Sequence, residues 1–372
     1  MDSGTRYSHV PAMLNHSRGV RGCAVLDPGV TNCGSVTIAT LVTGGNTTGG
    51  GVAEGGDPVL SNPVLVPVLF GAIFLFGVAG NALVVAVLAK NTSGKAHEGF
   101  THLYLLNLSV ADLSFLVLCV PFEATYYLLP RWIFGTFLCK FVHYAFHSSM
   151  IVSVFTLVAL SVDRYLTVRS VRRSFLRTRR SVHVSVLSLW LCALLLAAPV
   201  PQHQTLVQVD ALPLGPFCWE CWDTLREQRV YRVLTFTLSY LLPLTVICVC
   251  YAKVLYHMNT RVHNMSRKWA KSKQKTTLTV FVVVAAFFIS WLPHHIISLW
   301  VVFGTFPIND ATFVFRIAAH CLTYTGSCAN PAIYALCSLD VRAAAMRLLH
   351  LAPSPVELGE QGLGHDRRST HL

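Results

Sequence analysis

TTLTVFVVVAAFFISWLPHHIISLWVVF, residues 276–303, contains no Asp, Glu, Lys or Arg. A run of about 20 mainly apolar residues is enough to cross a hydrocarbon core of about 30 Å. Six further runs of this kind occupy residues 64–89, 101–129, 136–167, 184–202, 230–256 and 312–336. Short polar connectors join them, which favours neighbouring antiparallel helices. The sequence therefore predicts an all-α membrane protein, a seven-transmembrane helix bundle.

Composition agrees with lipid as the solvent. The 372 residues are 53% hydrophobic and 12% charged, with a mean hydropathy of +0.54, values that exclude an ordinary soluble multidomain protein. The first thirty residues lack a basic start followed by an apolar stretch of signal-peptide length. We therefore expect the first span to serve as the insertion signal.

Three regions follow from the pattern. Residues 1–62, rich in Gly, Thr and Ser, are expected to form a disordered extracellular tail, with Asn15 and Asn46 as candidate glycosylation sites. Residues 63–336 form the seven-transmembrane domain. Residues 337–372 form a cytoplasmic tail, in which a short amphipathic helix at about 339–351 is expected to lie along the membrane surface, near Cys337 as a candidate for lipidation.

Basic residues predict the orientation. The connectors after the first, third and fifth spans carry Lys90 and Lys95, then six arginines between 169 and 180, then six basic residues between 261 and 275. The opposite connectors are far poorer in positive charge. Because short basic loops stay in the cytoplasm, we expect a multi-pass plasma-membrane protein with an extracellular amino terminus. The basic loops are expected to contact anionic lipid, a partner protein or both.

Polar groups inside apolar spans need a structural or functional reason. Asn81, Asp112 and the stretch Asn330-Pro331-Ala332-Ile333-Tyr334 are expected at similar depth on inward-facing helices. A hydrogen-bonded knot that fixes helix packing and a functional site are both compatible with this pattern.

Two further motifs have alternative interpretations. Asp163-Arg164-Tyr165 ends the third span, where it could anchor the helix at the water boundary or form a latch that opens in a second state. Ser290-Trp291-Leu292-Pro293 in the sixth span and Pro243 in the fifth predict kinks, because proline removes a helix hydrogen bond. Such kinks serve either static packing or the coupling of a pocket to helix movement.

Together these motifs resemble those of rhodopsin-like G protein-coupled receptors, one set per helix in the same order. The matching residues are Asn81, Asp112, Asp163-Arg164-Tyr165, Trp190, Pro243, Tyr251, Trp291, Pro293, Asn330, Pro331 and Tyr334. The resemblance covers residues 64 to about 350. It implies a receptor that activates a Gα protein, with Asp163, Arg164, Tyr251, Trp291, Pro293, Asn330 and Tyr334 as the activation switch.

The same resemblance implies two other sites. Cys139 and Cys218 match the family's outer disulfide, although Cys221 is a second candidate for that bond. Asp112, Ser153 and Asn330 match an allosteric Na⁺ site, from which Gly326 departs because an asparagine would be expected there. No other cofactor and no structural metal is expected.

The third and seventh spans bear on which classes of ligand the receptor could bind. Receptors of this family for amines have an aspartate where this chain has Phe146, so a cationic amine would lack its counter-ion. The seventh span has no lysine to form a Schiff base with retinal. A cationic amine and retinal are therefore both disfavoured as ligands.

Longer stretches resemble galanin receptors, especially the type 1 branch. They are Leu129-Pro130-Arg131-Trp132, Cys139-Lys140-Phe141-Val142-His143-Tyr144, Phe217-Cys218-Trp219-Glu220, Cys250-Tyr251-Ala252-Lys253-Val254-Leu255, Ser290-Trp291-Leu292-Pro293-His294-His295-Ile296-Ile297 and Ala319-His320-Cys321-Leu322. This resemblance implies a galanin-like neuropeptide ligand, contacts at Phe146, His294, His295 and Phe313, and coupling mainly to inhibitory Gi/o proteins. Aromatic and histidine side chains one turn above Trp291 suit a peptide's aromatic residue.

Two positions depart from galanin receptors and leave the ligand open. Ser298 and Val302 stand where those receptors have a histidine and then a glutamate. A receptor for another amidated peptide, allatostatin-A-like or kisspeptin-like, therefore remains an alternative. A metal at the adjacent histidines His294 and His295 is disfavoured, because neighbouring residues on a helix point in different directions.

Other classes of protein fit less well. A transporter or channel would show an internal repeat or a ring of pore groups, and the sequence shows neither. A membrane enzyme would show acid and histidine residues at the spacing of a catalytic triad or a metal site, and no such set is present in the sequence. Few hydroxyls remain in the tail for phosphorylation-dependent arrestin binding, whereas Thr370-His371-Leu372 could add a strand to a PDZ domain. No nucleic-acid partner is expected.

Overall fold

The computed structural model describes residues 64–91, 99–129, 131–169, 179–207, 216–261, 267–307 and 310–337, together with 342, 345 and 346. Several predictions concern residues outside this part of the chain. They are the tail before residue 64 with Asn15 and Asn46, the connector 170–178, nearly all of the surface helix expected at 339–351, and the terminal Thr370-His371-Leu372.

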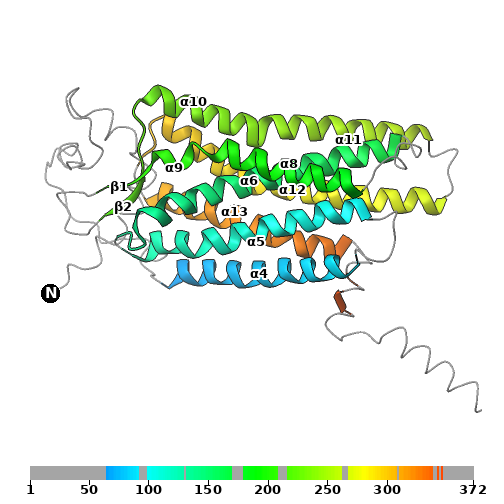
Figure 1. Cartoon of the computed structure of the whole chain (residues 1–372), viewed down its shortest axis with the longest axis horizontal. Coiled ribbons are helices and arrows are strands. Elements are labelled where there is room, and N and C mark those ends of the chain that lie inside the picture. Colours follow the sequence, from blue (N-terminus) through cyan, green and yellow to red (C-terminus); the bar gives the residue numbers. More distant parts are fainter. Residues whose placement is uncertain are drawn as a thin grey trace, which may run out of the picture.

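Seven long helical segments build the fold (Figure 1). They are α4 (Leu65–Asn91), α5 (Gly99–Leu128), α6 (Gly135–Arg169), α8 (Arg179–Ala197), the continuous segment α10 (Leu225–Phe236), η1 (Thr237–Leu241) and α11 (Leu242–Arg261), then α12 (Arg267–Phe303) and α13 (Asp310–Cys337). The predicted seven-helix bundle is confirmed.

Six of these segments are long and apolar enough to cross a membrane, within the part of the chain that the structure describes. The seventh, α13, has 28 residues but is more polar, because it carries Arg316, His320 and Asn330. All three side chains are buried against other helices. A helix of this kind satisfies its polar groups inside the bundle and turns its remaining surface outward.

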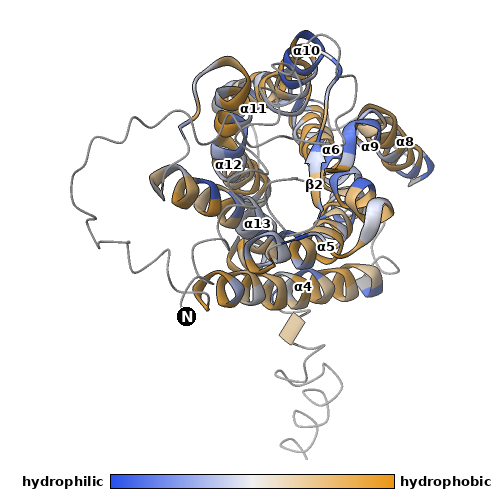
Figure 2. Ribbon diagram, turned by 90° about the vertical axis from the view of Figure 1, so that its left-hand side faces the viewer, coloured by the Kyte–Doolittle hydropathy of each residue, from blue (hydrophilic) through white to orange (hydrophobic). Residues whose placement is uncertain are grey.

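The helices form a ring, seen end-on in Figure 2. Helix α4 packs against α5 and α13, and α12 packs against α13. Helix α6 contacts α5, α8, α11 and α12. Large apolar side chains such as Phe76 and Leu195 remain exposed on the outside, as expected where lipid is the solvent.

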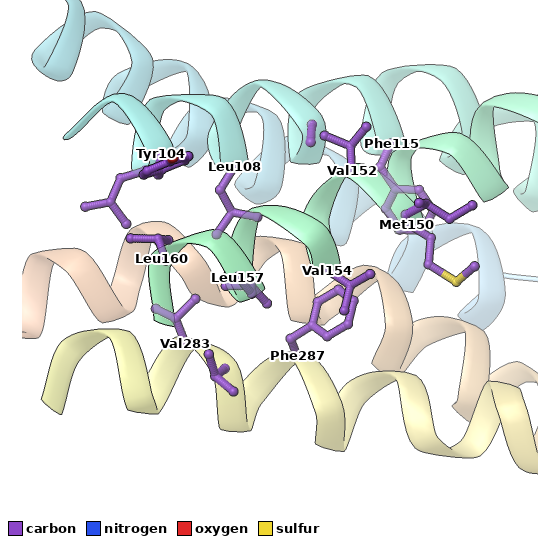
Figure 3. Packing of buried hydrophobic residues seen from close by; sticks show 14 of the residues in the cluster. Tyr104, Leu108, Phe115, Met150, Val152, Val154, Leu157, Leu160, Val283 and Phe287 are labelled. Atoms are coloured by element: carbon purple, nitrogen blue, oxygen red, sulfur yellow. The ribbon is translucent and has the colours of Figure 1, made fainter. Parts of the chain in front are cut away.

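The core lies around α6 (Figure 3). Leu157 and Leu160 of α6 are fully buried between Leu108 of α5 and Val283 and Phe287 of α12. Because lipid is as apolar as leucine, close packing and interhelical hydrogen bonds, not transfer from water, hold such helices together. This core is therefore sensitive to changes of shape.

Prolines account for two departures from the predicted spans. The fourth span was expected to be continuous over 184–202, but α8 ends at Ala197 and a separate turn, α9, runs over Val200–His203. Pro199 caps that turn and has no N–H to continue α8. In the fifth span, the helix widens into the π-helical turn η1, which ends at Leu241, two residues before Pro243.

A β-hairpin at one end of the bundle was not predicted. Strand β1 (Gln204–Val207) pairs with β2 (Phe217–Glu220) in antiparallel register, with Gln204 opposite Glu220 and Val207 opposite Phe217. We call this end of the bundle the hairpin end, and the other, where α6 carries Asp163 and Arg164, the Arg164 end. The all-α membrane fold class is confirmed, and the structure adds one short hairpin, whose strands are too short and mixed to show alternation in the sequence.

The disulfide between Cys139 and Cys218 joins α6 to β2, as the resemblance implied. Cys221 takes no part in it; its backbone N–H donates to the His203 carbonyl across the hairpin, at 2.7 Å. The Trp132 N–H donates to the Pro216 carbonyl at 2.8 Å and adds a second tie to the hairpin. These ties place the hairpin over the bundle axis.

Candidate functional site

A cavity opens at the hairpin end between the helices and the hairpin. Its free volume is small, about 90 Å³. Its lining comes from α5, α6, β1, β2, α10, α12 and α13 and comprises Glu123, His143, Phe146, His147, Gln204, Trp219, Glu220, Gln228, Arg232, His294, Ile297, Ser298, Val301 and His320.

The deep part of the cavity is aromatic. The Phe146 ring lies 5.5 Å from that of Trp291, 5.3 Å from that of His294 and 5.2 Å from that of Phe115, measured between ring centroids. Tilted and edge-to-face pairs at such distances are favourable beyond the area they bury. A ligand that touches Phe146 or His294 therefore presses on Trp291, two residues before Pro293 in the interior of α12.

The four predicted peptide contacts lie in two layers. Phe146 and His294 line the cavity. His295 is buried behind them, with ring centroids 5.6 Å from Phe236 and 5.0 Å from Tyr240. Phe313 is also buried and packs against Tyr127, 6.0 Å away. In this structure His295 and Phe313 thus support the wall and do not line the cavity.

An ion pair that the sequence did not single out forms one side of the cavity. His320 Nδ1 of α13 lies 2.6 Å from Glu123 Oε1 of α5, and both side chains are nearly inaccessible to solvent. The Tyr127 hydroxyl lies 3.2 Å from the same nitrogen. Glu123 is an acid within an apolar span, a signal in the sequence that could have pointed to it.

A second ion pair faces the first from the other side. Arg232 Nη2 of α10 donates to Glu220 Oε2 of β2, and Arg232 Nη1 donates to Ser298 Oγ of α12 at 3.2 Å. Trp222 Nε1 donates to the other Glu220 oxygen at 2.5 Å. Arg232 thus connects the hairpin, α10 and α12 at one point.

The charge state of Glu220 follows from these neighbours. Burial raises the pKa of this carboxyl, but the facing Arg232 guanidinium and the Trp222 hydrogen bond lower it further than burial raises it. The pKa of Glu220 therefore lies below its ordinary value, and the group is a carboxylate at neutral pH.

Asp112 belongs to a hydrogen-bonded network that joins three helices in the middle of the bundle. Its Oδ1 accepts from Ser327 Oγ at 2.8 Å and its Oδ2 from Asn330 Nδ2 at 2.6 Å. Asn81 Nδ2 donates to the Ser327 carbonyl at 3.0 Å. The predicted knot of Asn81, Asp112 and Asn330 is thus present, and Ser327 is a member that the sequence did not suggest.

The Asp112 neighbourhood bears on the predicted Na⁺ site. Oxygen atoms of Asp112, Ser153 and Ser327 have the hard-donor chemistry that suits such a cation. Gly326 supplies no oxygen, and a Cβ added to it would lie 2.8 Å from the Ser290 Cβ of α12. The space that an asparagine side chain would need there is therefore filled by Ser290.

At the Arg164 end, the Asp163–Arg164 pair of the predicted latch is formed. Arg164 Nη2 donates to Asp163 Oδ2 at 3.0 Å, and both side chains are buried. The Tyr251 ring of α11 packs against that of Phe281 on α12, 5.4 Å away. The Tyr334 hydroxyl of α13 is buried with no hydrogen-bond partner in the described part of the chain. These residues come from four helices that meet at this end of the bundle.

Comparison with known proteins agrees with the predicted family. Residues 80–334 match the family model of the 7 transmembrane receptor (rhodopsin family). The chain is 52% identical over 278 residues to galanin receptor type 1 of Homo sapiens. The aligned region covers 74% of this chain and 79% of that protein. It is 41% identical over 292 residues to galanin receptor type 3 of Mus musculus (77% and 78% covered) and 38% identical over 282 residues to galanin receptor 2a of Danio rerio (75% and 76% covered).

Proposed function

The chain belongs to the rhodopsin family of seven-transmembrane receptors and, within it, to the galanin receptors, and from this premise we propose that it is the receptor of a galanin-like neuropeptide. The family is one of G protein-coupled receptors, not of enzymes. The aromatic floor of the cavity carries the proposal, because Phe146 and His294 form a surface for a peptide's aromatic side chain directly against Trp291.

Binding at this floor would act on the helix kink. Trp291 and Pro293 belong to the same turn of α12, so a ligand that displaces Phe146 or His294 favours one position of α12 over another. At the Arg164 end, α12 lies beside α11, where Phe281 contacts Tyr251. We infer that movement of α12 releases Arg164 from Asp163 and opens a site for the G protein.

The finer parts of the proposal concern partners and orientation. Coupling mainly to Gi/o proteins, residence in the plasma membrane and an extracellular hairpin end are supported by the family and by the basic connectors after the first, third and fifth spans. Arrestin and a PDZ domain are proposed as further partners of the tail. An allosteric Na⁺ would be held by Asp112 and Ser153, next to Asn330, and would favour the closed latch.

The test is a peptide panel on the full chain in cells. Dissociation sensors for Gi, Go, Gs and Gq proteins are followed as galanin, kisspeptin, allatostatin-A and unrelated peptides are added. We expect galanin to activate, with Gi and Go responding at the lowest concentrations. The control is Arg164→Ala, which should reach the surface and remain silent.

Ser298 and Val302 make the ligand the sharpest part of this test, because they replace a histidine and a glutamate of galanin receptors. Silence towards galanin together with a response to allatostatin-A or kisspeptin would overturn the proposed ligand and leave the receptor class intact. Responses only through Gs or Gq would overturn the proposed coupling.

A further inference from the structure

Arg232 occupies a polar subsite of the cavity that is distinct from its aromatic floor. This subsite consists of Glu220 of β2, Gln228 and Arg232 of α10 and Ser298 of α12, all of which line the cavity. Arg232 is mostly buried, with 18% of its side chain exposed. A ligand at the floor beside His294 therefore has part of its surface next to these four side chains.

The subsite has hydrogen-bonding capacity that the protein leaves unused. A guanidinium has five N–H donors, and the two bonds described above use Nη1 and Nη2 of Arg232. The Arg232 Nε is buried without a partner in the described part of the chain, and so is the Oε1 atom of Gln228, a side chain with only 3% exposure. Buried polar atoms without partners are costly, so a ligand group that accepts from the Arg232 guanidinium gains affinity, and a carboxamide could in addition donate to Gln228 Oε1.

The charges that line the cavity decide which ligand group suits this place. Both of its carboxylates are already engaged: Glu123 Oε1 lies 2.6 Å from His320 Nδ1, and Glu220 pairs with Arg232. Val302, where galanin receptors have a glutamate, brings no acid to this part of α12. An ammonium or guanidinium from a ligand would therefore meet Arg232 with no carboxylate left to balance it, and like charges at such an interface are strongly unfavourable.

We propose that Arg232 is a specificity-determining residue of this receptor, which selects a peptide group that accepts hydrogen bonds, a carboxylate or a carboxamide, and rejects a cationic one. This inference rests on the proposed function only in that the ligand is a peptide. It deepens that function by assigning the second contact region of the peptide, beside the aromatic floor.

Peptide selection by three receptor variants tests the proposal. Wild type, Arg232→Gln and the control Arg229→Gln are placed in nanodiscs and used to select binders from a random peptide library displayed on phage. Arg229 is a matched control, because it is an exposed arginine one turn away on α10 that does not line the cavity. It registers any effect of positive charge on the outer surface.

We expect the wild-type pool to favour Asp, Glu, Asn and Gln over Lys and Arg by at least about tenfold relative to the Arg232→Gln pool, as for loss of a close charge contact. Arg229→Gln should match wild type. Identical pools from wild type and Arg232→Gln would overturn the proposal, and so would an equal change with Arg229→Gln. If Arg232→Gln does not reach the membrane, Arg232→Lys takes its place, with cations still rejected but the preference for planar carboxylates and carboxamides reduced.

Galanin activation separates this inference from the proposed ligand. A galanin response by wild type with no difference between the pools would overturn the role of Arg232 alone. No galanin response together with the expected difference would overturn galanin as the ligand and leave Arg232 as the specificity determinant.

Discussion

The middle of the bundle and the hairpin end hold their buried acids in different ways. Asp112 accepts from the hydroxyl of Ser327 and the amide of Asn330, both neutral donors on one helix, and lies in tightly packed surroundings. Glu123 lies against the His320 imidazole and Glu220 against the Arg232 guanidinium, and each pair joins different elements beside a cavity. The first arrangement fixes helix packing, whereas the second leaves charged groups where a ligand can exchange partners with them.

The largest effect is expected when the disulfide that holds the hairpin to the bundle is broken. Cys218→Ala breaks the disulfide that joins β2 to α6, and loss of such a bond costs about 2–5 kcal/mol. We expect agonist response to be lost, measured as G protein activation at matched surface expression. Cys221→Ala is the matched control, three residues away and outside the disulfide, and should respond nearly as wild type. Equal damage by the two substitutions would mean that the hairpin is not held by Cys218.

Glu123→Gln tests whether the hairpin end depends on its ion pairs. The substitution leaves His320 buried without its carboxylate, and breaking a buried pair costs about 3 kcal/mol. The thermal midpoint of the purified receptor in nanodiscs should fall by several degrees. Glu227→Gln, which changes an exposed acid on α10, should leave the midpoint unchanged. If both variants unfold at the wild-type temperature, Glu123 and His320 do not stabilise one another.

Gly326→Ala tests the tight packing around Asp112. The added Cβ would meet Ser290, so we expect a loss of about 1–3 kcal/mol, again as a lower thermal midpoint. Gly71→Ala is the control, since a Cβ there meets nothing within 4 Å. A second substitution, Ser290→Gly, should restore stability to Gly326→Ala. Failure of that rescue would show that Gly326 is needed for another reason.

The smallest expected effect separates the two histidines. His294→Ala should lower agonist potency by about tenfold, roughly 1.4 kcal/mol, with little change in thermal stability, because His294 lines the cavity. His295→Ala should lower the thermal midpoint as well as potency, because its ring is packed against Phe236 and Tyr240. The opposite pattern, with stability lost only at His294, would exchange the roles of the two residues.

Much of the inner structure was predictable from the sequence. Asn81, Asp112 and Asn330 are polar residues in apolar runs, and lipid leaves such groups few places except the bundle interior. That they belong to one hydrogen-bonded network follows from helix order and depth. Ser327 was not predictable, because a serine in a membrane span usually bonds to its own helix and shows no sign of a distant partner.

The cavity was less predictable. Phe146 and His294 were expected beside Trp291 and lie there. That His294 lines the cavity while His295 is buried behind it depends on the rotation of α12 about its own axis. The sequence of α12 does not define this rotation, because its apolar residues occur on several faces of the helix. Arg232 lies near the start of the fifth span, where a basic residue is ordinary. Only its contacts with Glu220 and Ser298 distinguish it.

The amino-acid sequence by itself determined that seven helices cross a bilayer, which connectors are basic, and where prolines and inward polar residues stand. These properties are local, since length and hydropathy decide insertion residue by residue. The tertiary structure decided which side chains meet: the hairpin over the bundle, Cys218 and not Cys221 in the disulfide, and Arg232 between Glu220 and Ser298. Such pairings join residues far apart in the chain, and they depend on helix rotation and loop path, which no single segment specifies.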